Sequence, residues 1–388
     1  MIITFWVAMF LVFYTFFGYG ILLYFIVKLK RLLSRSKRKT YPYTELPDCT
    51  LIVAAYNEEA FIEEKIHNTL LLDYPEAKLQ LVFVTDGSTD NTPDLVAQYP
   101  QIKLLHRAER SGKISAVHRA IEEVTTELIV FTDANTFLNK DALTLLCRHY
   151  ADPKVGAVAG EKRVMIEAEA DATAGEGFYW KYESKLKTWD SELHTVVGAA
   201  GELFSIRRNL YEPVPPNSVL DDFMISMRIA EKGFVIVYEP EAYAMETSSA
   251  NIHEELKRKI RIAAGGIQSV LWLKSLLNPF KFPVLSFQYI SHRVLRWTIT
   301  PILMIAVLIM NIQLVFSGAP YFYSLLLIAQ VVFYFAAYLG KVMESRKIRV
   351  KALFIPYYFC IMNYAILAGL IRFCFGEQSV IWEKARRK

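Results

Sequence analysis

Long apolar runs near both ends of the chain enclose a central region where short apolar runs alternate with polar stretches. Residues 3–27 (ITFWVAMFLVFYTFFGYGILLYFIV) carry no charge and are long enough to cross a bilayer core of about 30 Å. Two further apolar runs, near 298–316 and 321–340, are joined by SGAP and predict a hairpin of spanning helices. The pattern therefore predicts a membrane protein with a large central domain.

The charges beside these runs predict their orientation. Basic residues follow the first run directly, and the hairpin returns to another basic stretch, KVMESRKIRVK at 341–351. Because positive charge marks the cytoplasmic side, we expect the central region to lie in the cytosol and the N-terminus outside. A fourth apolar run, 352–375, is interrupted by a proline, an asparagine and an arginine. It either spans the membrane or is re-entrant or interfacial, which leaves the side of the following basic tail open.

Four short apolar runs in the central region predict strands. Stretches of helical character, ten or more residues long, separate most of them. Strands that alternate with helices predict an α/β fold with a mostly parallel sheet covered by helices on both faces. In such sheets ligands bind beyond the carboxyl ends of the strands. The four runs are TLIVAA at 50–55, LQLVFVT at 79–85, IKLLH at 102–106 and ELIVFTD at 127–133.

Residues 266–296, between the central region and the hairpin, mix apolar and basic positions. Pro279 and Pro283 divide this stretch in two, and neither half has the apolar length of a span. Each half is typical of a helix in the membrane interface, with apolar groups toward the acyl chains and basic groups toward the headgroups. The alternative is that both halves complete the core of the soluble domain. The residues expected to face the lipid are Leu271, Trp272 and Leu276.

Composition and charge do not indicate a nucleic-acid-binding protein, a cysteine metal site or a disulfide-stabilised fold. Of the 388 residues, 53% are hydrophobic, and the formal net charge is +5. The positive charge is concentrated beside the apolar runs, where anionic lipid headgroups account for it and nucleic acid is not implied. The 4 cysteines show neither metal-ligand spacing nor a disulfide framework.

Acidic and amide side chains stand at three of the predicted strand ends. The first strand is followed by YNEE (56–59), the second by TDGSTD (85–90) and the fourth by TDANT (132–136). Each of these alone fits a turn or a helix cap, where Asn, Asp, Ser and Thr are favoured. Three such ends on one sheet favour a shared crevice, where carboxylates suit a metal ion or a ligand rich in hydroxyl groups. Asp86 is the residue of the second turn that we expect to face a ligand.

The ordered set of motifs resembles the family 2 glycosyltransferases. The motifs are VAAYNEE, VTDGSTD, RSGKISAVHRA, FTDAN, GAAGELFSIRR and LDDF, and the resemblance extends to SHRVLRW and WEKARR toward the C-terminus. More narrowly, the chain is similar to the membrane-embedded branch that includes poly-N-acetylglucosamine, hyaluronan and cellulose synthases. The resemblance implies a GT-A fold, a nucleotide-sugar donor that is usually UDP-linked, and inversion at the anomeric carbon.

The resemblance also implies residues that bind the donor. Asp86 matches the family residue that bonds uracil, and Tyr56 and Glu58 are expected to line the base and ribose. Lys113 matches a lysine near the nucleotide. RSGK does not have the spacing of a P-loop, so a phosphate-binding loop of that class is not implied.

TDAN occupies the place of the family's metal-binding Asp-x-Asp. Asp133 and Asn135 are therefore the expected metal ligands. Hard cations such as Mg²⁺ or Mn²⁺ prefer oxygen ligands, often one or two carboxylates together with substrate phosphate. Asn135 offers a neutral carbonyl in place of the second carboxylate, so we expect a weaker site that depends more on the diphosphate.

The two carboxylates of LDDF are the candidates for acid–base chemistry. A helix that starts near Asp221 places both in its first turn, where the helix dipole favours negative charge and where capping alone would also explain them. By resemblance, Asp222 is the general base that accepts the proton of the attacking hydroxyl, with Asp221 beside it. A glycosidase needs two acids about 5 to 10 Å apart, on opposite sides of the scissile bond. Asp221 and Asp222 are adjacent and point in different directions, so LDDF does not favour a glycosidase.

The sequence signals for residues that bind the acceptor are less specific than those for the donor. GAAGELFSIRR lies beside the acceptor in the family, which makes Gly201 and Glu202 candidates. Tyr182, Leu186 and Trp189 share one face of a predicted helix, a spacing typical of packing. Because aromatic faces also suit sugar rings, an acceptor role for Trp189 or Tyr182 stays open.

The clearest departure from the family is RKIRI, where processive relatives carry Gln-x-x-Arg-Trp. Arg261 matches the arginine and can pair with a diphosphate through its planar fork. The missing Gln and Trp put processivity in doubt, and a catalytically impaired nucleotide-sugar-binding protein tethered to the membrane is the alternative. A dinucleotide-dependent oxidoreductase is excluded because no Gly-x-Gly-x-x-Gly follows the first strand.

These features predict five segments and a location. The segments are an N-terminal transmembrane helix (1–28), a cytosolic GT-A domain (45–265), interfacial helices (266–296), a C-terminal transmembrane region (297–376) and a basic tail (377–388). We expect a multi-pass protein of the cell (inner) membrane. The expected partners are a UDP-sugar donor (N-acetylglucosamine or glucose), membrane lipids, and a polysaccharide or lipid-linked acceptor, with no nucleic acid. With about four spans, a polymer channel would require a partner membrane protein or a second copy.

Overall fold

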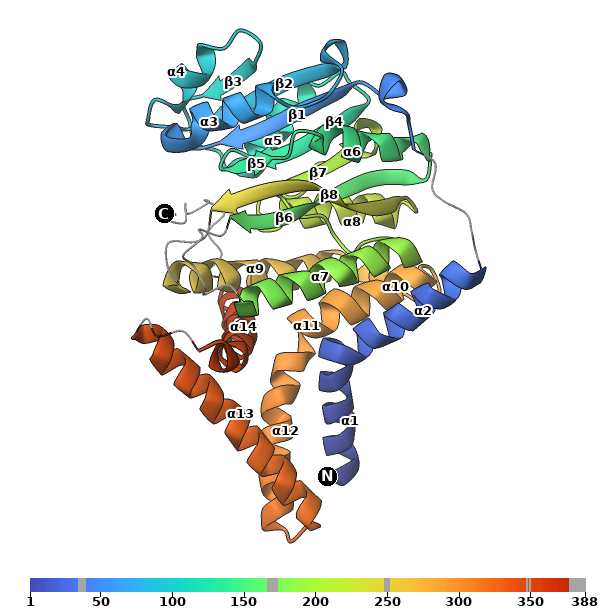
Figure 1. The fold of residues 1–388 in the computed structure, drawn as a ribbon, viewed down its shortest axis with the longest axis vertical. Helices are drawn as coiled ribbons and strands as arrows, with labels where there is room; N and C mark the ends of the chain where they lie inside the picture. The colour runs from blue at the N-terminus through green and yellow to red at the C-terminus, as the bar shows by residue number, and fades with distance from the viewer. Residues whose placement is uncertain (34–39, 166–173, 248–251, 347, 349, 377–388) are drawn as a thin grey trace.

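The structure is a computed structural model and describes residues 1–33, 40–165, 174–247, 252–346, 348 and 350–376. It has three levels along its longest axis (Figure 1). An α/β domain forms one end, a layer of helices lies beneath it, and long helices that include the N-terminus form the other end. The predicted basic tail, with the motif WEKARR, lies outside the described residues.

The described residues form one eight-stranded sheet with the order β3-β2-β1-β4-β7-β6-β8-β5. The predicted parallel arrangement is confirmed for β1 to β4, since β1 pairs in parallel with β2 and β4, and β2 with β3. β7 is antiparallel to both β4 and β6, so the other half of the sheet is mixed. The strands are β1 Cys49–Ala55, β2 Leu79–Asp86, β3 Lys103–Arg107, β4 Leu128–Asp133, β5 Thr136–Leu138, β6 Val155–Met165, β7 Leu203–Arg207 and β8 Val235–Thr247.

Helices cover both faces of the sheet, as predicted. Successive residues of a strand point to opposite faces, and all seven residues of β1 are buried. Ile52 of β1 packs in one core cluster with the apolar faces of α5 and α8, and Leu51 packs in the other cluster with α3 and α6. The helices are α3 Glu59–Leu70, α4 Thr92–Ala97, α5 Lys113–Glu122, α6 Ala142–Cys147 and α8 Asp221–Glu231.

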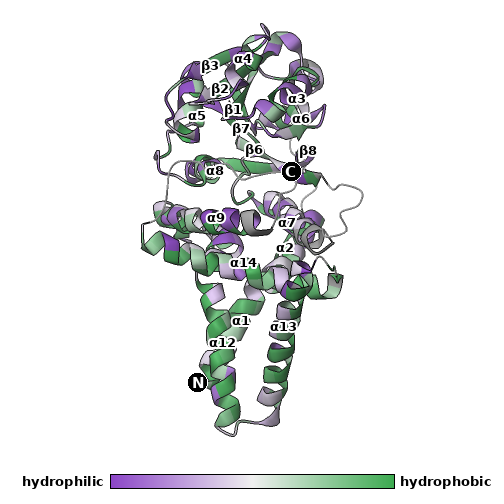
Figure 2. Cartoon of the chain, turned by 90° about the vertical axis from the view of Figure 1, so that its left-hand side faces the viewer, coloured by the Kyte–Doolittle hydropathy of each residue, from purple (hydrophilic) through white to green (hydrophobic). Residues whose placement is uncertain are grey.

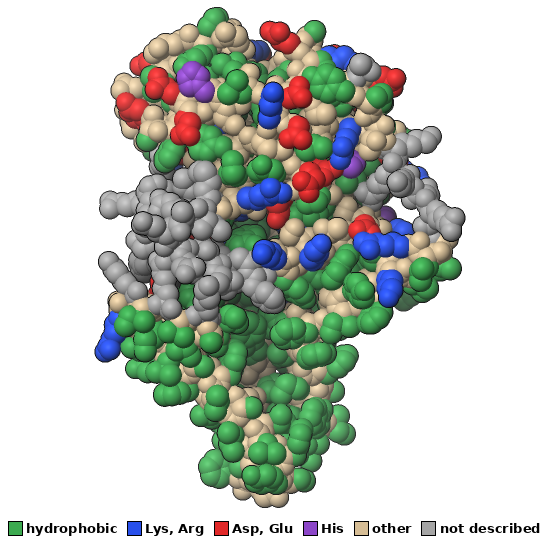
Figure 3. Space-filling view, viewed as in Figure 1, with side chains coloured by type: hydrophobic (Ala, Val, Ile, Leu, Met, Phe, Trp, Pro, Cys, Tyr) green, Lys and Arg blue, Asp and Glu red, His purple; other side chains and the backbone are tan. Residues whose placement is uncertain are grey.

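Among the described residues, four helical segments are long and apolar enough to cross a membrane: Ile2–Leu33, Ile299–Phe316, Tyr321–Ser345 and Ala352–Cys374. They comprise α1 Ile2–Phe13 and α2 Tyr19–Leu33, joined by a π-helical turn, with α12 Ile299–Phe316, α13 Tyr321–Ser345 and α14 Lys351–Cys374. Apolar residues dominate α1, α12 and α13 (Figure 2). On the face shown in Figure 3, the surface of this end is almost wholly apolar, whereas charged side chains gather on the α/β domain. The chain is therefore a membrane protein, and its orientation stays a prediction.

The intermediate layer contains α7 Ala174–Leu193, α9 Ile252–Trp272, α10 Pro283–Tyr289 and α11 Leu295–Trp297. α14 is seen nearly end-on beneath α9, while α1, α12 and α13 run along the long axis (Figure 1). This direction agrees with the interfacial alternative for residues 352–375.

The predicted lipid-facing residues of 266–296 divide into two groups. Leu271 and Trp272 are 55% and 36% exposed, and the neighbouring Phe280 is 95% exposed, as an interfacial segment requires. The prediction for Leu276 is wrong, because its side chain is fully buried in the core cluster that also contains α8. The segment thus completes the protein core with one face and offers the other to solvent or lipid.

Candidate active site

The turns after β1 and β2 are bonded to each other. Asn57 has a positive φ of 52°, and its Oδ1 accepts a hydrogen bond from the Thr89 amide at 2.8 Å. The Asn57 amide donates to Ser88 Oγ at 3.2 Å, and the Glu58 amide donates to Thr92 Oγ1 at 2.9 Å. Asn tolerates this backbone conformation better than most residues. The two polar motifs therefore form one fixed rim at the carboxyl edge of the sheet.

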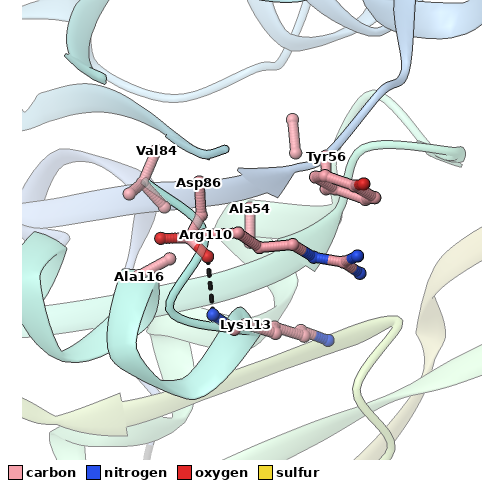
Figure 4. A pocket seen from close by; sticks show the side chains of 9 residues that line it. Ala54, Tyr56, Val84, Asp86, Arg110, Lys113 and Ala116 are labelled. Carbon is pink, nitrogen blue, oxygen red and sulfur yellow. Dashed lines mark hydrogen bonds between the residues drawn. The ribbon is translucent and has the colours of Figure 1, made fainter. Parts of the chain in front are cut away.

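Asp86, at the end of β2, lies in a first hollow next to this rim (Figure 4). Its Oδ2 accepts hydrogen bonds from the amides of Ser111 at 2.8 Å and Gly112 at 2.6 Å. Oδ1 is buried, and no hydrogen bond from a described residue reaches it; the nearest cation is Arg119 Nη1 at 3.8 Å. A buried acceptor of this kind suits one N–H of a ligand. The first hollow is lined by Ala54, Ala55, Tyr56, Val84, Asp86, Arg110, Gly112, Lys113 and Ala116.

Tyr56 and Arg110 form one wall of the first hollow. The Arg110 guanidinium lies 3.8 Å from the centre of the Tyr56 ring, in cation–π geometry (Figure 4). Such a planar pair can stack on a nucleobase. Sequence reasoning gave Arg110 no role, although it belongs to the RSGK motif. The predicted partner Glu58 is 1% exposed and is not among the residues that line this hollow.

Lys113, the first residue of α5, links the first hollow to a second one. Its Nζ donates to Asp133 Oδ1 at 2.7 Å. Burial opposes the lysine charge, but the carboxylates of Asp133 and Asp221 outweigh it, so the pKa of Lys113 is raised. The lysine therefore stays protonated between the two hollows. The second hollow is lined by Ile52, Ala54, Lys113, Val117, Phe131, Thr132, Asp133, Gly201, Phe204, Asp221 and Ile225.

Asp221 and Asp222 occupy the first turn of α8, as predicted. A Cβ atom on Gly201 would lie 3.2 Å from Asp222 Oδ2, so the glycine leaves the space over this carboxylate open. Burial and the negative charge of Asp221 raise the pKa of Asp222 to about 7, against the opposing effect of Lys113. A carboxyl group with a pKa near the operating pH is suited to general base catalysis.

Glu202, next to Gly201, is held by an ion pair that the sequence did not predict. Lys162 of β6 lies 2.5 Å from Glu202 Oε1 and also contacts Glu246 of β8. Although burial alone would raise it, the pKa of Glu202 is held well below its usual range by the Lys162 ammonium. The Glu202 carbonyl accepts a hydrogen bond from Thr132 Oγ1 at 2.9 Å. Glu202 thus connects the Gly201 turn to the end of β4.

Lys65 of α3, another residue missed from the sequence, lies fully buried beneath TDANT. Its Nζ donates to the Thr136 carbonyl at 2.6 Å and to Thr132 Oγ1 at 3.2 Å. Burial lowers the pKa of Lys65 to about 7. It anchors the turn that carries Asp133 from below.

Six predicted residues line neither hollow: Glu58, Glu202 and Asp222 lie next to residues that do, and three further ones lie elsewhere. Asn135 is buried at 5% exposure, directly after the turn of Asp133. Arg261 lies on α9, beneath the sheet. Trp189 contacts the N-terminal helices, with its ring 5.4 Å from the ring of Tyr24. These contacts fit the packing interpretation of Trp189, and the functional roles of all three residues stay predictions.

Few side chains near Asp133 could act as metal ligands. No group of three or more His, Cys, Asp or Glu side chains in the described part of the chain is arranged to hold a metal ion. One carboxylate facing an open hollow fits a cation that takes most of its other ligands from water and substrate phosphate, as Mg²⁺ commonly does. Asp133 meets this requirement, since it lines the second hollow.

Comparison with known proteins identifies the domain around these hollows. The family model for glycosyl transferase family 2 matches residues 50–214. Poly-beta-1,6-N-acetyl-D-glucosamine synthase of Staphylococcus aureus is 24% identical over 245 residues, which are 61% of this chain and 59% of that protein. Beta-monoglucosyldiacylglycerol synthase of Synechocystis sp. is 28% identical over 249 residues, 60% of this chain and 50% of that protein. The chain thus spans between half and two thirds of the length of these relatives.

A solved structure extends the likeness to the whole fold. The mannosyltransferase PcManGT from Pyrobaculum calidifontis, in complex with GDP-Man and Mn²⁺, superposes with a TM-score of 0.71 and 24% identity. The superposition covers 96% of this chain and 99% of that one, so the layer beneath the sheet and the apolar helices are included. Residues 50–214 are thus similar to glycosyl transferase family 2, and the chain shares the GT-A-like fold of the solved mannosyltransferase.

Proposed function

We propose that the chain transfers a sugar from a UDP-sugar to an acceptor hydroxyl at the membrane surface, with Asp222 as the general base. The observation that carries this proposal is the carboxylate of Asp222. Its pKa is about 7, and its carboxylate lies beside Gly201, which together with Asp221 lines the second hollow that also holds Lys113 and Asp133. The alternative, a binder without turnover, would not need a carboxyl group poised in this way.

Asp86 supports uracil as the donor base. Its Oδ2 already accepts two backbone hydrogen bonds, which leaves Oδ1 as the acceptor for the ligand. Uracil presents a single N–H, at N3, whereas guanine presents adjacent N1–H and N2–H groups that suit two free carboxylate oxygens. The pair of Tyr56 and Arg110 would stack on the base.

The reaction needs one proton transfer and one displacement. Asp222 accepts the proton of the acceptor hydroxyl while that oxygen attacks the anomeric carbon, and the bond from this carbon to the diphosphate oxygen breaks. Attack from the side opposite the diphosphate inverts the configuration. Lys113 lies beside Asp133 and is placed to balance negative charge on the leaving UDP. A divalent cation, Mg²⁺ or Mn²⁺, held by Asp133 and the diphosphate would stabilise the same charge.

The proposed acceptor is a polysaccharide or a lipid-linked acceptor, and the proposed location of the catalytic domain is the cytosolic side of the cell (inner) membrane. The four apolar helical segments and the exposed Leu271 and Trp272 support an acceptor presented at the membrane. The named activities of the two relatives, a polymer synthase and a glucolipid synthase, support these two acceptor classes.

The first prediction concerns the donor. Purified protein in nanodiscs with Mg²⁺ or Mn²⁺ is expected to release UDP from UDP-N-acetylglucosamine or UDP-glucose faster than GDP from GDP-mannose, because Asp86 offers one free acceptor. Nucleotide release against this panel is the measurement. No release from any UDP-sugar would count against the proposal, and tight UDP binding without release would favour the catalytically impaired binder.

The second prediction concerns pH. Only ionised Asp222 can accept a proton, so kcat is expected to fall about tenfold per pH unit below pH 7 and to level off above it. The fall is caused by protonation of Asp222, since a group with a pKa of about 7 is largely ionised only at higher pH. Initial rates with saturating donor from about pH 5.5 to about 8.5 test it. A rate that stays constant down to the acid end would contradict the role of Asp222.

A further inference from the structure

The first turn of α8, which carries Asp221 and Asp222, lacks the usual side-chain cap. Its N-cap residue is Leu220, whose apolar side chain donates and accepts no hydrogen bond. Helices normally begin at Ser, Thr, Asp or Asn, whose oxygen binds the free amides of the first turn. With no side-chain cap, the backbone of the loop before α8 sets the place of the two carboxylates.

Gln268 of α9 makes two hydrogen bonds to the loop just before α8. Its Nε2 donates to the Asn217 carbonyl at 3.0 Å, and its Oε1 accepts a hydrogen bond from the Val219 amide at 3.2 Å. Because the side chain is buried at 6% exposure, water cannot easily replace either bond. Using both ends of the amide group fixes its orientation and spaces the two backbone groups. The loop is thus held two residues before Asp221.

Gly265 brings the same loop into contact with the backbone of α9. A Cβ atom at this position would lie 2.7 Å from Val219 Cβ and 3.1 Å from Leu220 Cγ. Only glycine leaves room for such an approach. The loop therefore rests directly on α9, within reach of Gln268 three residues further along the helix.

Neighbouring residues of α9 contact membrane helices. A Cβ atom on Gly369 of α14 would lie 2.9 Å from both the Ala264 amide nitrogen and the Ile260 carbonyl oxygen, so the two backbones touch. A Cβ atom on Gly266 would lie 2.7 Å from the ring of Trp297, which leads into α12. One stretch of α9 thus joins the loop of the candidate base to two apolar helices.

We propose that Gln268 is a positioning residue that sets the place of Asp222 from the membrane-contacting helix α9. A general base acts only within hydrogen-bond reach of the proton it accepts, and a displacement of about 1 Å can cost roughly 100-fold in rate. The inference rests on the proposed function, because it assumes that Asp222 acts on the acceptor. It adds that the position of the base depends on α9, a helix that contributes no side chain to the lining of either hollow.

The test replaces Gln268 by methionine, which has a similar length and removes both hydrogen bonds. We expect kcat to fall by about 10- to 100-fold, while the KM for the UDP-sugar changes less than about threefold. Loosening the loop admits water around Asp222, so the midpoint of the pH–rate profile should move to lower pH. Hydrogen exchange at the Val219 amide should become faster. Ser269→Ala is the matched control, because Ser269 is also buried on α9 but bonds only to the Gly265 carbonyl within the helix.

Gly265→Ala is the second variant, in case Gln268→Met folds poorly. It pushes the loop through the added methyl group without touching Gln268, and the same loss of kcat and acid shift are expected. The positioning role would be overturned if both α9 variants kept the wild-type kcat and pH midpoint while wild type is active and Asp222→Asn is inactive. If Asp222→Asn itself keeps wild-type turnover, the proposed function fails instead. A lower kcat with an unmoved midpoint and unchanged Val219 exchange would also overturn the inference, since general destabilisation would explain it.

Discussion

Asp222→Asn is expected to lower kcat by about 10²- to 10⁴-fold while UDP still binds. Asparagine has the same shape but cannot take a proton, so the variant removes the base and leaves the crevice around Gly201 intact. Single-turnover transfer and UDP affinity, measured on the same preparation, separate chemistry from binding. The wild-type dependence on pH near 7 should disappear from the residual rate, because the group with the raised pKa is gone.

Asp221→Asn is the matched control for this prediction. Its carboxylate is adjacent in the same helical turn, and its charge is one of the causes that raise the pKa of Asp222. Removing that charge should shift the pH–rate profile to lower pH with a smaller loss of kcat at high pH. If Asp222→Asn kept a turnover near that of wild type, or if Asp221→Asn lost more, the assignment of Asp222 as the base would be wrong.

The elements that could be predicted from the sequence are those with continuous apolar patterns. Strands β1 and β4 are short apolar runs buried at nearly every position, and the spans are long, mostly apolar runs, so each has a signal of its own. β3 is an apolar run at the edge of the sheet and has no fully buried residue. The antiparallel β7 and the three-residue β5 have no comparable pattern, because their pairing is decided by partners far along the chain. Leu276 shows the same limit, since an amphipathic pattern does not distinguish a lipid-facing leucine from one that faces the protein core.

The strand-end residues were predictable because parallel strands bring their carboxyl ends to one edge. Tyr56, Asp86 and Asp133 come from three neighbouring strands and line the two adjoining hollows. Lys65 and Lys162 were missed, because their partners are 67 or more residues away for Lys65 and 40 for the Lys162–Glu202 pair. Such buried ion pairs and hydrogen bonds need the fold before they can be seen. No spacing in the sequence marks them.

Asp133→Ala is expected to lower transfer by at least about 10³-fold, because a cation at a transferring group contributes several kcal/mol. TDAN has no second carboxylate that could take over the role of Asp133. UDP release is measured over a range of Mg²⁺ and Mn²⁺ concentrations, with chelator-treated wild type as the reference. Asn135→Asp is the matched control: it restores an Asp-x-Asp and should be tolerated, with half-maximal activity at a lower cation concentration. Near wild-type turnover in Asp133→Ala would show that the metal site is wrongly placed.

The same variant also deprives Lys113 of its partner at 2.7 Å, and this second effect must be separated from the loss of a metal ligand. An ammonium released from Asp133 would act more strongly on Asp221 and Asp222 and lower the pKa of Asp222, which reduces its strength as a base. If this were the whole cause, removing the lysine charge as well should restore activity. We expect instead that Asp133→Ala with Lys113→Met is no more active than Asp133→Ala, because neither change returns the ligand. A double-mutant cycle with Lys113→Met alone measures the coupling, which contacting residues show as a departure from additivity. Recovery of transfer in the double variant would assign Asp133 to holding the lysine rather than to a cation.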